Sequence, residues 1–367
     1  MLAFIVFLGI LLVYILLVVY VERKVSAFVQ DRYGPREVGF KGMGQTVADL
    51  LKLIQKEDIV PAAADKKLFM LAPLVIFVSV FAGYAVLPLT PDLIGSGAAV
   101  GVLFLITIIS LDVIGLIMAG WGSNNKYSLL GALRSVSQII SYEIPLTLSI
   151  LAVVMICQTL DLQAISFQQG IWINEYAGQA KDINYLFGLK SLGINVTNMG
   201  GILSWNIVRM PLLLIAFIIF FITSLAESNR APFDIPEAES ELVAGFHTEY
   251  SGFRFAFLFL AEYGMMLLVA FLSVILFLGS WNTPFPNISS VRLADWTSGA
   301  PGTIAGNLWG AFWLLSKVAG IVFLQIMIRW TYPRLRVDQL MYLCWKVLTP
   351  IALIIVLIAG IWRLWMV

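Results

Sequence analysis

Long stretches without a charged residue recur along the chain and are separated by shorter polar segments. A helix needs about 20 apolar residues to cross a bilayer core of roughly 30 Å, because lipid offers no partner to an unpaired backbone amide. The pattern therefore predicts an all-α polytopic membrane protein with eight transmembrane helices, whose two termini lie on the same side. The predicted spans are residues 1–21, 68–89, 98–121, 139–160, 210–226, 255–281, 308–328 and 347–366.

The segment 22–67, between the first two spans, contains a different pattern. In residues 45–56 apolar side chains recur with helical spacing, and polar side chains fall largely on the other side. This periodicity predicts an amphipathic helix at the membrane surface. Such a helix is either a simple interfacial anchor or one wall of a cavity that admits an amphiphile with a long apolar tail. The apolar positions are Val47, Leu50, Leu51 and Ile54.

Composition supports a membrane protein and limits its chemistry. Hydrophobic residues make up 60% of the 367 residues and charged residues 12%, against about 45–50% and about 25% in soluble domains. The formal net charge of +1 argues against a nucleic-acid-binding chain. Two cysteines and one histidine, His247, are too few for an iron–sulfur cluster, a four-cysteine zinc site or a bis-histidine haem. We therefore expect no metal site and no redox centre on this chain.

The basic residues predict the orientation of the spans. Loops on one side carry 17 of the 23 Lys and Arg residues, and loops on the other side carry four. Because basic residues collect in cytoplasmic loops, the first set is predicted to be cytoplasmic and both termini periplasmic. We expect one membrane domain, residues 1–367, in which 22–67 and 227–254 are cytoplasmic loops. Residues 161–209 form a long external loop to which the sequence assigns no function.

The loop 227–254 is the densest acidic segment of the chain. If Pro236 begins a helix there, a position that suits its fixed φ, Glu237 and Glu241 lie on one face. The carboxylates form either a solvated acidic face or a group that holds protons, because crowded and partly buried carboxylates favour each other's neutral form. Six of them fall within 23 residues beside a single cation, Arg230: Glu227, Asp234, Glu237, Glu239, Glu241 and Glu249.

Charged residues inside the spans are candidate functional groups, because a charge in the bilayer is costly. Asp112 and Lys317 lie in the third and seventh spans, and Glu143 and Glu262 in the fourth and sixth. A buried Asp–Lys pair can be purely structural. Three carboxylates together with the acidic loop favour a proton relay instead, and His247 fits either a structural residue or a proton carrier.

Seven segments carry distinctive charged, Gly, Pro or aromatic positions: residues 22–24, 30–39, 48–53, 120–134, 140–143, 226–241 and 329–339. In these segments the chain resembles the H subunit family of bacterial NADH:quinone oxidoreductase (respiratory complex I), whose mitochondrial counterpart is NADH dehydrogenase subunit 1. The resemblance covers nearly the whole chain. The external loop 161–209 is its main departure, because it is longer here than in many relatives.

This resemblance implies a membrane subunit of a proton-pumping NADH:quinone oxidoreductase, which is an enzyme only as part of the complex. The substrate is a quinone, ubiquinone or menaquinone, in a chamber shared with the peripheral arm, whose subunits hold FMN and the iron–sulfur clusters. Antiporter-like subunits continue the proton path, and the complex lies in the bacterial inner membrane. The implied quinone-binding residues are Arg23, Asp49, Leu50 and Lys52. The implied proton path is Glu143, Glu227, Asp234, Glu237, Glu239, Glu241 and Glu262.

Two other functions stay open at this point. An autonomous cation/proton antiporter would use Asp112 and Lys317, but it would need an inverted repeat, and the sequence shows none. The membrane anchor of an energy-converting hydrogenase would need no quinone. The well-developed loop 22–67 argues against that anchor.

Overall fold

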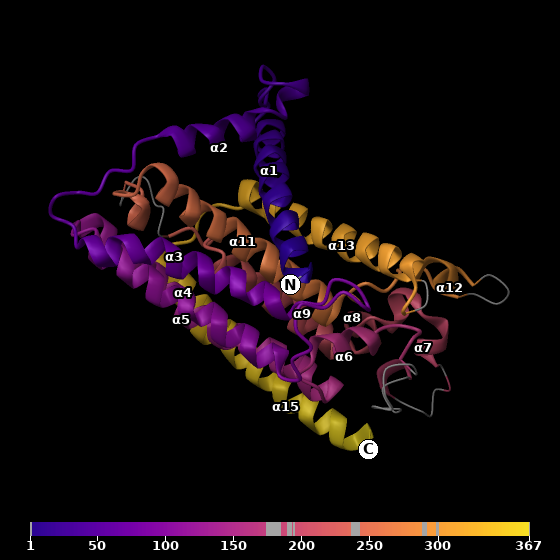
Figure 1. The fold of residues 1–367 in the computed structure, drawn as a ribbon. Helices are drawn as coiled ribbons and strands as arrows, with labels where there is room; N and C mark the ends of the chain where they lie inside the picture. Colours follow the sequence, from indigo (N-terminus) through magenta and orange to yellow (C-terminus); the bar gives the residue numbers. More distant parts are fainter. Residues whose placement is uncertain are drawn as a thin grey trace.

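The computed structural model describes residues 2–173, 185–188, 193, 195–235, 243–287, 292–298 and 301–366. These residues form a helical fold without a named strand (Figure 1). The α-helices are α1 (Leu2–Val29), α2 (Gln45–Gln55), α3 (Lys66–Gly83), α4 (Gly101–Gly122), α5 (Lys126–Cys157), α6 (Leu162–Phe167), α7 (Val196–Met199), α8 (Asn206–Arg209), α9 (Pro211–Glu227), α11 (Gly252–Phe277), α12 (Leu293–Ser298), α13 (Ile304–Thr331), α14 (Val337–Tyr342) and α15 (Thr349–Met366). Short 3-10 turns are η1 (Phe40–Gly42), η2 (Tyr84–Val86), η4 (Leu186–Gly188), η6 (Gly201–Ser204) and η7 (Gly245–His247), and η8 (Leu343–Leu348) is a π-helical turn.

Among the described helices, seven are long and apolar enough to cross a membrane, and α9 is a shorter apolar helix. Each of the eight predicted spans coincides with one of these helices, which confirms the predicted all-α polytopic fold. Figure 1 shows α3, α4 and α5 running together, with α15 along α5. Helix α13 lies on the other side of the bundle, next to α1 and α11.

Several helices extend beyond the spans that hydropathy predicts. The largest differences are that α1 continues to Val29, α5 begins at Lys126 rather than at residue 139, and the last span begins with α14 at Val337 rather than at residue 347. Asn125 starts α5, because its side chain accepts a hydrogen bond from the backbone N–H of Tyr127, as an N-cap residue does. The polar first turns of α5 then pack on η7. Hydropathy misses these turns because a cap and protein packing hold them, not lipid.

Helix α11 is the centre of the bundle. Within its most apolar stretch, 83% of the residues are buried inside the protein, and it contacts α2, α3, α9 and α13. Helices α3 and α4 pack closely because Gly115 has no side chain: a Cβ atom there would lie 2.4 Å from Cγ1 of Ile76. Small residues permit this close approach of membrane helices. The packing brings the inner faces of α4, α9 and α11 around one region of the interior.

The predicted amphipathic helix at 45–56 is α2, which confirms that pattern. It leads away from the end of α1 (Figure 1) and contacts both α1 and α11. Val47, Leu51 and Ile54 remain exposed, as in a helix that lies at a membrane interface. Helix α2 therefore bounds a space between α1 and α11 on the predicted cytoplasmic side.

The opposite end of the bundle carries α6, α7, α8 and α12 (Figure 1). There the buried Arg209 donates hydrogen bonds to the carbonyl of Gln168 at 2.9 Å and to Oδ1 of Asn206 at 2.7 Å. The Lys317 ammonium on α13 donates to the carbonyls of Leu278, Ser280 and Asn282 at 2.8, 2.9 and 2.6 Å. These carbonyls follow the last turn of α11, where helical partners run out. The positive charges of Arg209 and Lys317 thus have structural partners.

Candidate functional site

A cavity of about 260 Å³ lies between α1, α2 and α11. One side of it is apolar and includes Leu16, Val19 and Phe259, and the other side is polar. Ligand pockets commonly combine an apolar wall with a few polar groups that fix orientation. All four predicted quinone-binding residues line this cavity: Arg23, Asp49, Leu50 and Lys52. The structure therefore brings together residues from two helices that the sequence analysis had grouped.

The polar end of this cavity is organised around Asp49. The Arg23 Nη1 atom lies 2.6 Å from Oδ2 of Asp49, and the Lys52 Nζ atom lies 3.9 Å from Oδ1. Partial burial acts to raise the pKa of Asp49, but the hydrogen bond and charge of Arg23, with smaller contributions from Gln45 and Lys52, hold it below its usual value. Asp49 is therefore ionised at neutral pH and keeps Arg23 turned toward the cavity.

A buried ion network lies directly behind Arg23. Its neighbour Glu22 is 7% exposed, forms an ion pair with Arg329 and lies 3.6 Å from Nη1 of Arg230. The Tyr263 hydroxyl donates to Oε2 of Glu22 at 2.6 Å. Arg230 also pairs with Glu262 at 3.2 Å through its Nε atom. Every charge in this network therefore has an opposite partner, which a buried charge requires.

Local sequence patterns do not predict this network. The charged triplet of residues 22–24 follows an apolar run and has the pattern of a loop, but α1 continues through it. Its partners Arg230 and Arg329 are remote in sequence. The available signal was Arg230, the one cation inside the acidic segment.

Asp234 lies on the loop after α9, beside the same network. Its Oδ2 atom pairs with Nη2 of Arg334 at 3.0 Å. Burial raises the pKa of Asp234 above its usual value, although the positive charge of Arg334 opposes the shift. Asp234 thus accepts a proton more readily than an exposed aspartate. The predicted helix start at Pro236 and the predicted path residues Glu237, Glu239 and Glu241 lie outside the described residues.

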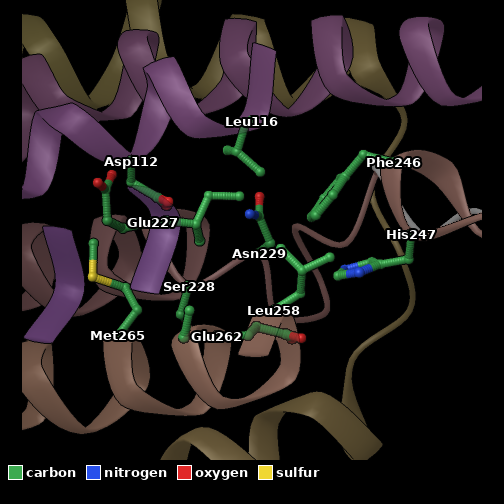
Figure 2. A pocket seen from close by; sticks show the side chains of 12 residues that line it. Asp112, Leu116, Glu227, Ser228, Asn229, Phe246, His247, Leu258, Glu262 and Met265 are labelled. Carbon is green, nitrogen blue, oxygen red and sulfur yellow. The ribbon is translucent and has the colours of Figure 1, made fainter. Parts of the chain in front are cut away.

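Two small cavities are lined by the carboxylates inside the bundle. The first, of about 30 Å³, is lined by Asp112, Glu227, Glu262 and His247 (Figure 2). The second, of about 10 Å³, has an apolar lining and lies between Glu227 and Glu143. Glu227, at the end of α9, therefore lies between Glu262 of α11 and Glu143 of α5. The Glu143 carboxylate also accepts a hydrogen bond from the Ser110 hydroxyl.

The two remaining candidates from the sequence have different environments. Burial lowers the pKa of His247 to about 4, so its imidazole is neutral at pH 7. Lys317 bonds to three backbone carbonyls and packs over the Trp205 ring, 4.2 Å from the ring centre. In the described part of the chain, no ion pair joins Lys317 to Asp112. Lys317 therefore acts as a structural group, and Asp112 faces the carboxylate cavity.

No cluster of three or more His, Cys, Asp or Glu side chains that could hold a metal occurs among the described residues. Both cysteines, Cys157 and Cys344, are buried and free. What the geometry offers is an apolar chamber with a cationic end and a separate series of buried carboxylates. The first suits a neutral amphiphile, and the second suits protons.

Comparison with known proteins decides the family. The family model described as NADH dehydrogenase matches residues 2–360. The chain belongs to this family. Members with similar sequences include the second H subunit of the NADH-quinone oxidoreductase of Cytophaga hutchinsonii, which is 65% identical over 360 residues and 98% of both chains. The resemblance found in the sequence is thereby confirmed.

More distant members of the NADH dehydrogenase family are also covered over most of their length. The NADH-quinone oxidoreductase H subunit of Chlorobium luteolum is 50% identical over 348 residues, which are 95% of this chain and 84% of that protein. The corresponding H subunit of Geobacillus sp. is 44% identical over 341 residues, 93% of this chain and 86% of that protein. Together with the apolar helices, family membership shows a multi-pass membrane protein.

Proposed function

We propose that this chain is a membrane subunit of a proton-pumping NADH:quinone oxidoreductase. In this proposal it forms the quinone entrance and chamber with the peripheral arm and begins the proton path. Helix α1 carries the proposal, because Arg23 lines the apolar chamber while its neighbour Glu22 joins the buried ion network. The names of the matching family and relatives support the coarser part of the proposal.

In the chamber, an isoprenoid quinone enters laterally from the bilayer past α2, with its tail against Leu50 and Phe259. Arg23 donates a hydrogen bond to a quinone carbonyl, and Asp49, itself next to Lys52, orients Arg23. Reduction to the quinol takes up two electrons and two protons. The electrons come from partner subunits that carry FMN and iron–sulfur clusters. This chain supplies binding, orientation and a route for protons.

The proton path runs across the bundle from the ion network. Glu262 and Glu227 face one cavity, and Glu227 and Glu143 face the next, which supports a proposed order of transfer from α11 to α9 and then to α5. Quinol formation changes the charge near α1 and thereby the proton occupancy of these groups. Antiporter-like subunits then receive the proton. The path residues are Glu143, Glu227, Asp234 and Glu262, with Glu237, Glu239 and Glu241 on the same acidic loop.

The distribution of basic residues and the chamber beside α2 bear on the orientation of the chain and on the type of complex. The bacterial relatives and the apolar helices support a bacterial inner membrane location, and the excess of basic residues on one side, 17 of 23, supports periplasmic termini. The chamber formed with α2 favours a quinone-reducing complex over a hydrogenase anchor, which needs no quinone site.

Glu227→Gln in the assembled complex tests the proposal. Glutamine keeps the size of the side chain but cannot carry a proton, so proton translocation into vesicles should fall about tenfold or more. NADH oxidation by an artificial acceptor, which takes electrons before the quinone site, should be unchanged. The control is Glu249→Gln, because Glu249 accepts a hydrogen bond from Asn125 and lines neither carboxylate cavity. Wild-type proton translocation in Glu227→Gln would refute the path.

A further inference from the structure

Asp112 is a buried carboxylate that the proposed path does not use. It lies in the middle of α4 and is 9% exposed. Its side chain faces the same cavity as Glu227, and Figure 2 shows the two carboxylates close together, with Glu262 on the opposite wall. A carboxylate at this depth in a membrane helix is costly and calls for a partner.

Neither Asp112 nor Glu227 has a full set of partners. The Asp112 Oδ1 and Glu227 Oε2 atoms are buried without a hydrogen-bond partner in the described part of the chain. No described Lys or Arg forms an ion pair with either side chain. The other two carboxylates of the region differ, because Glu262 pairs with Arg230 and Glu143 accepts a hydrogen bond from Ser110. Two carboxylates with unsatisfied oxygens therefore face one cavity.

Two uncompensated anions are unfavourable in such a space. Removing each charge from water costs on the order of several kcal/mol, and the two charges also repel each other. Carboxylates in this arrangement titrate as a pair that retains one proton. The cavity of about 30 Å³ exceeds the roughly 10–15 Å³ that one water molecule needs. The polar groups of Asn229 and His247 also line it.

We propose that Asp112 and Glu227 share one proton through water in this cavity, which makes Asp112 a second proton-holding group beside the path. The inference rests on the proposed function. With one proton the pair carries a charge of −1. A proton that arrives through water from the Glu262 side neutralises the pair, and its release from Glu227 toward Glu143 restores the charge. The pair thus never holds two negative charges during transfer.

Other titratable groups surround the Asp112–Glu227 pair, and they come from the described elements that pack around the cavity. Helix α11 contributes Glu262, which is paired with Arg230, and η7 contributes His247. Helix α5 contributes Glu143 behind the second cavity. Helix α3 contributes only the apolar Ile76 to the lining. Asp112 and Glu227 are therefore the two carboxylates lining this cavity that form no ion pair with a described Lys or Arg.

Asp112→Asn in the assembled complex, reconstituted into vesicles, tests the inference. Asparagine removes the neighbouring negative charge that keeps the proton on Glu227. Proton pumping falls above a certain pH, and this pH limit should therefore be lower by about one unit in the variant. A close charge shifts a titration by about one to three units, and the smallest of these shifts is expected here. Asp112→Glu should keep the wild-type limit, and Glu249→Gln is the control for loss of a carboxylate elsewhere. An unchanged limit in Asp112→Asn overturns the inference.

A second measurement separates this inference from the proposed function. Infrared spectra of the complex in H₂O and D₂O should show a protonated carboxyl band that shifts in both Asp112→Asn and Glu227→Gln, because each variant leaves one carboxyl group that no longer shares its proton. An unshifted band in both variants overturns proton sharing, whatever the pumping result. If Glu227→Gln stops pumping but Asp112→Asn keeps the wild-type pH limit, the path stands and only the role of Asp112 fails. If Asp112→Asn does not assemble, a shifted band in Asp112→Glu supports sharing, and an unshifted band refutes it.

Discussion

Arg23→Ala should weaken quinone binding without unfolding the chain. Arg23 connects α1 to α2 through Asp49, 2.6 Å away, and it lines the chamber. The side chains are 43% and 28% exposed, so the ion pair resembles a surface pair worth about 1 kcal/mol or less. Its loss alone therefore leaves assembly of the complex largely intact.

The loss of a hydrogen bond to the quinone should be larger. A bond between a charged donor and a carbonyl contributes about 1.5–3 kcal/mol. Because roughly 1.4 kcal/mol corresponds to a factor of ten, the KM for quinone should rise about 10- to 100-fold in Arg23→Ala. The turnover at saturating quinone should change much less, since Arg23 transfers neither electrons nor protons.

The assay is NADH oxidation by purified complex at a series of concentrations of a short-tailed quinone. Arg36→Ala is the matched control, because Arg36 stacks on Tyr33, 3.6 Å from the ring centre, and does not line the chamber. Arg23→Lys should fall between wild type and Arg23→Ala, since it keeps the charge but not the planar donor. An unchanged KM and unchanged inhibitor sensitivity in intact Arg23→Ala complex would refute the role of Arg23.

Two further predictions concern stability. Lys317→Met should lower the free energy of unfolding by about 3 kcal/mol, roughly 1 kcal/mol for each of the three carbonyls that lose a donor. Thermal melting of the complex measures this loss, with Lys317→Arg as the control. Melting of Lys317→Met at the wild-type temperature would contradict the structural role of Lys317. Because burial lowers the pKa of His247 to about 4, the unfolded chain binds that proton first as the pH falls below about 6.5. The contribution of neutral His247 to the free energy of unfolding is therefore fully present above that pH. At pH 5 this contribution should be smaller by about 2 kcal/mol. His247→Gln should abolish that part of the pH dependence in thermal melts. If the variant loses as much stability at low pH as the wild type, His247 is not the cause.

The spans were predictable because lipid imposes one dominant requirement, a long apolar helix. The amphipathic helix at 45–56 was predictable because its periodicity is independent of what it packs against. The first turns of α5 were not, because they depend on the cap at Asn125 and on contact with η7. Local patterns thus gave the elements, and the ends set by tertiary contacts required the structure.

The candidate site divides in the same way. Arg23 lies with residues of α2 around one cavity, a grouping that the family resemblance implied and that no local pattern predicts. The pairing of Glu22 with Arg230 and Arg329 could not be predicted, because no periodicity relates α1 to residues that lie more than 200 positions away. Partner choice among buried charges depends on which helix faces meet, and only the packed bundle defines that.

The arrangement around Arg230 indicates how the chamber can affect the proton path. Consecutive residues of a helix point about 100° apart, so rigid α1 presents Arg23 to the chamber and Glu22 to the interior. Arg230 is shared, 3.6 Å from Glu22 and 3.2 Å from Glu262. Under the proposed function, a change of charge near Arg23 acts on the ion pair of Glu22 with Arg230, and Arg230 in turn pairs with Glu262. Because Glu262 faces the cavity that contains Glu227, Arg230 joins the ion network to the proposed proton path.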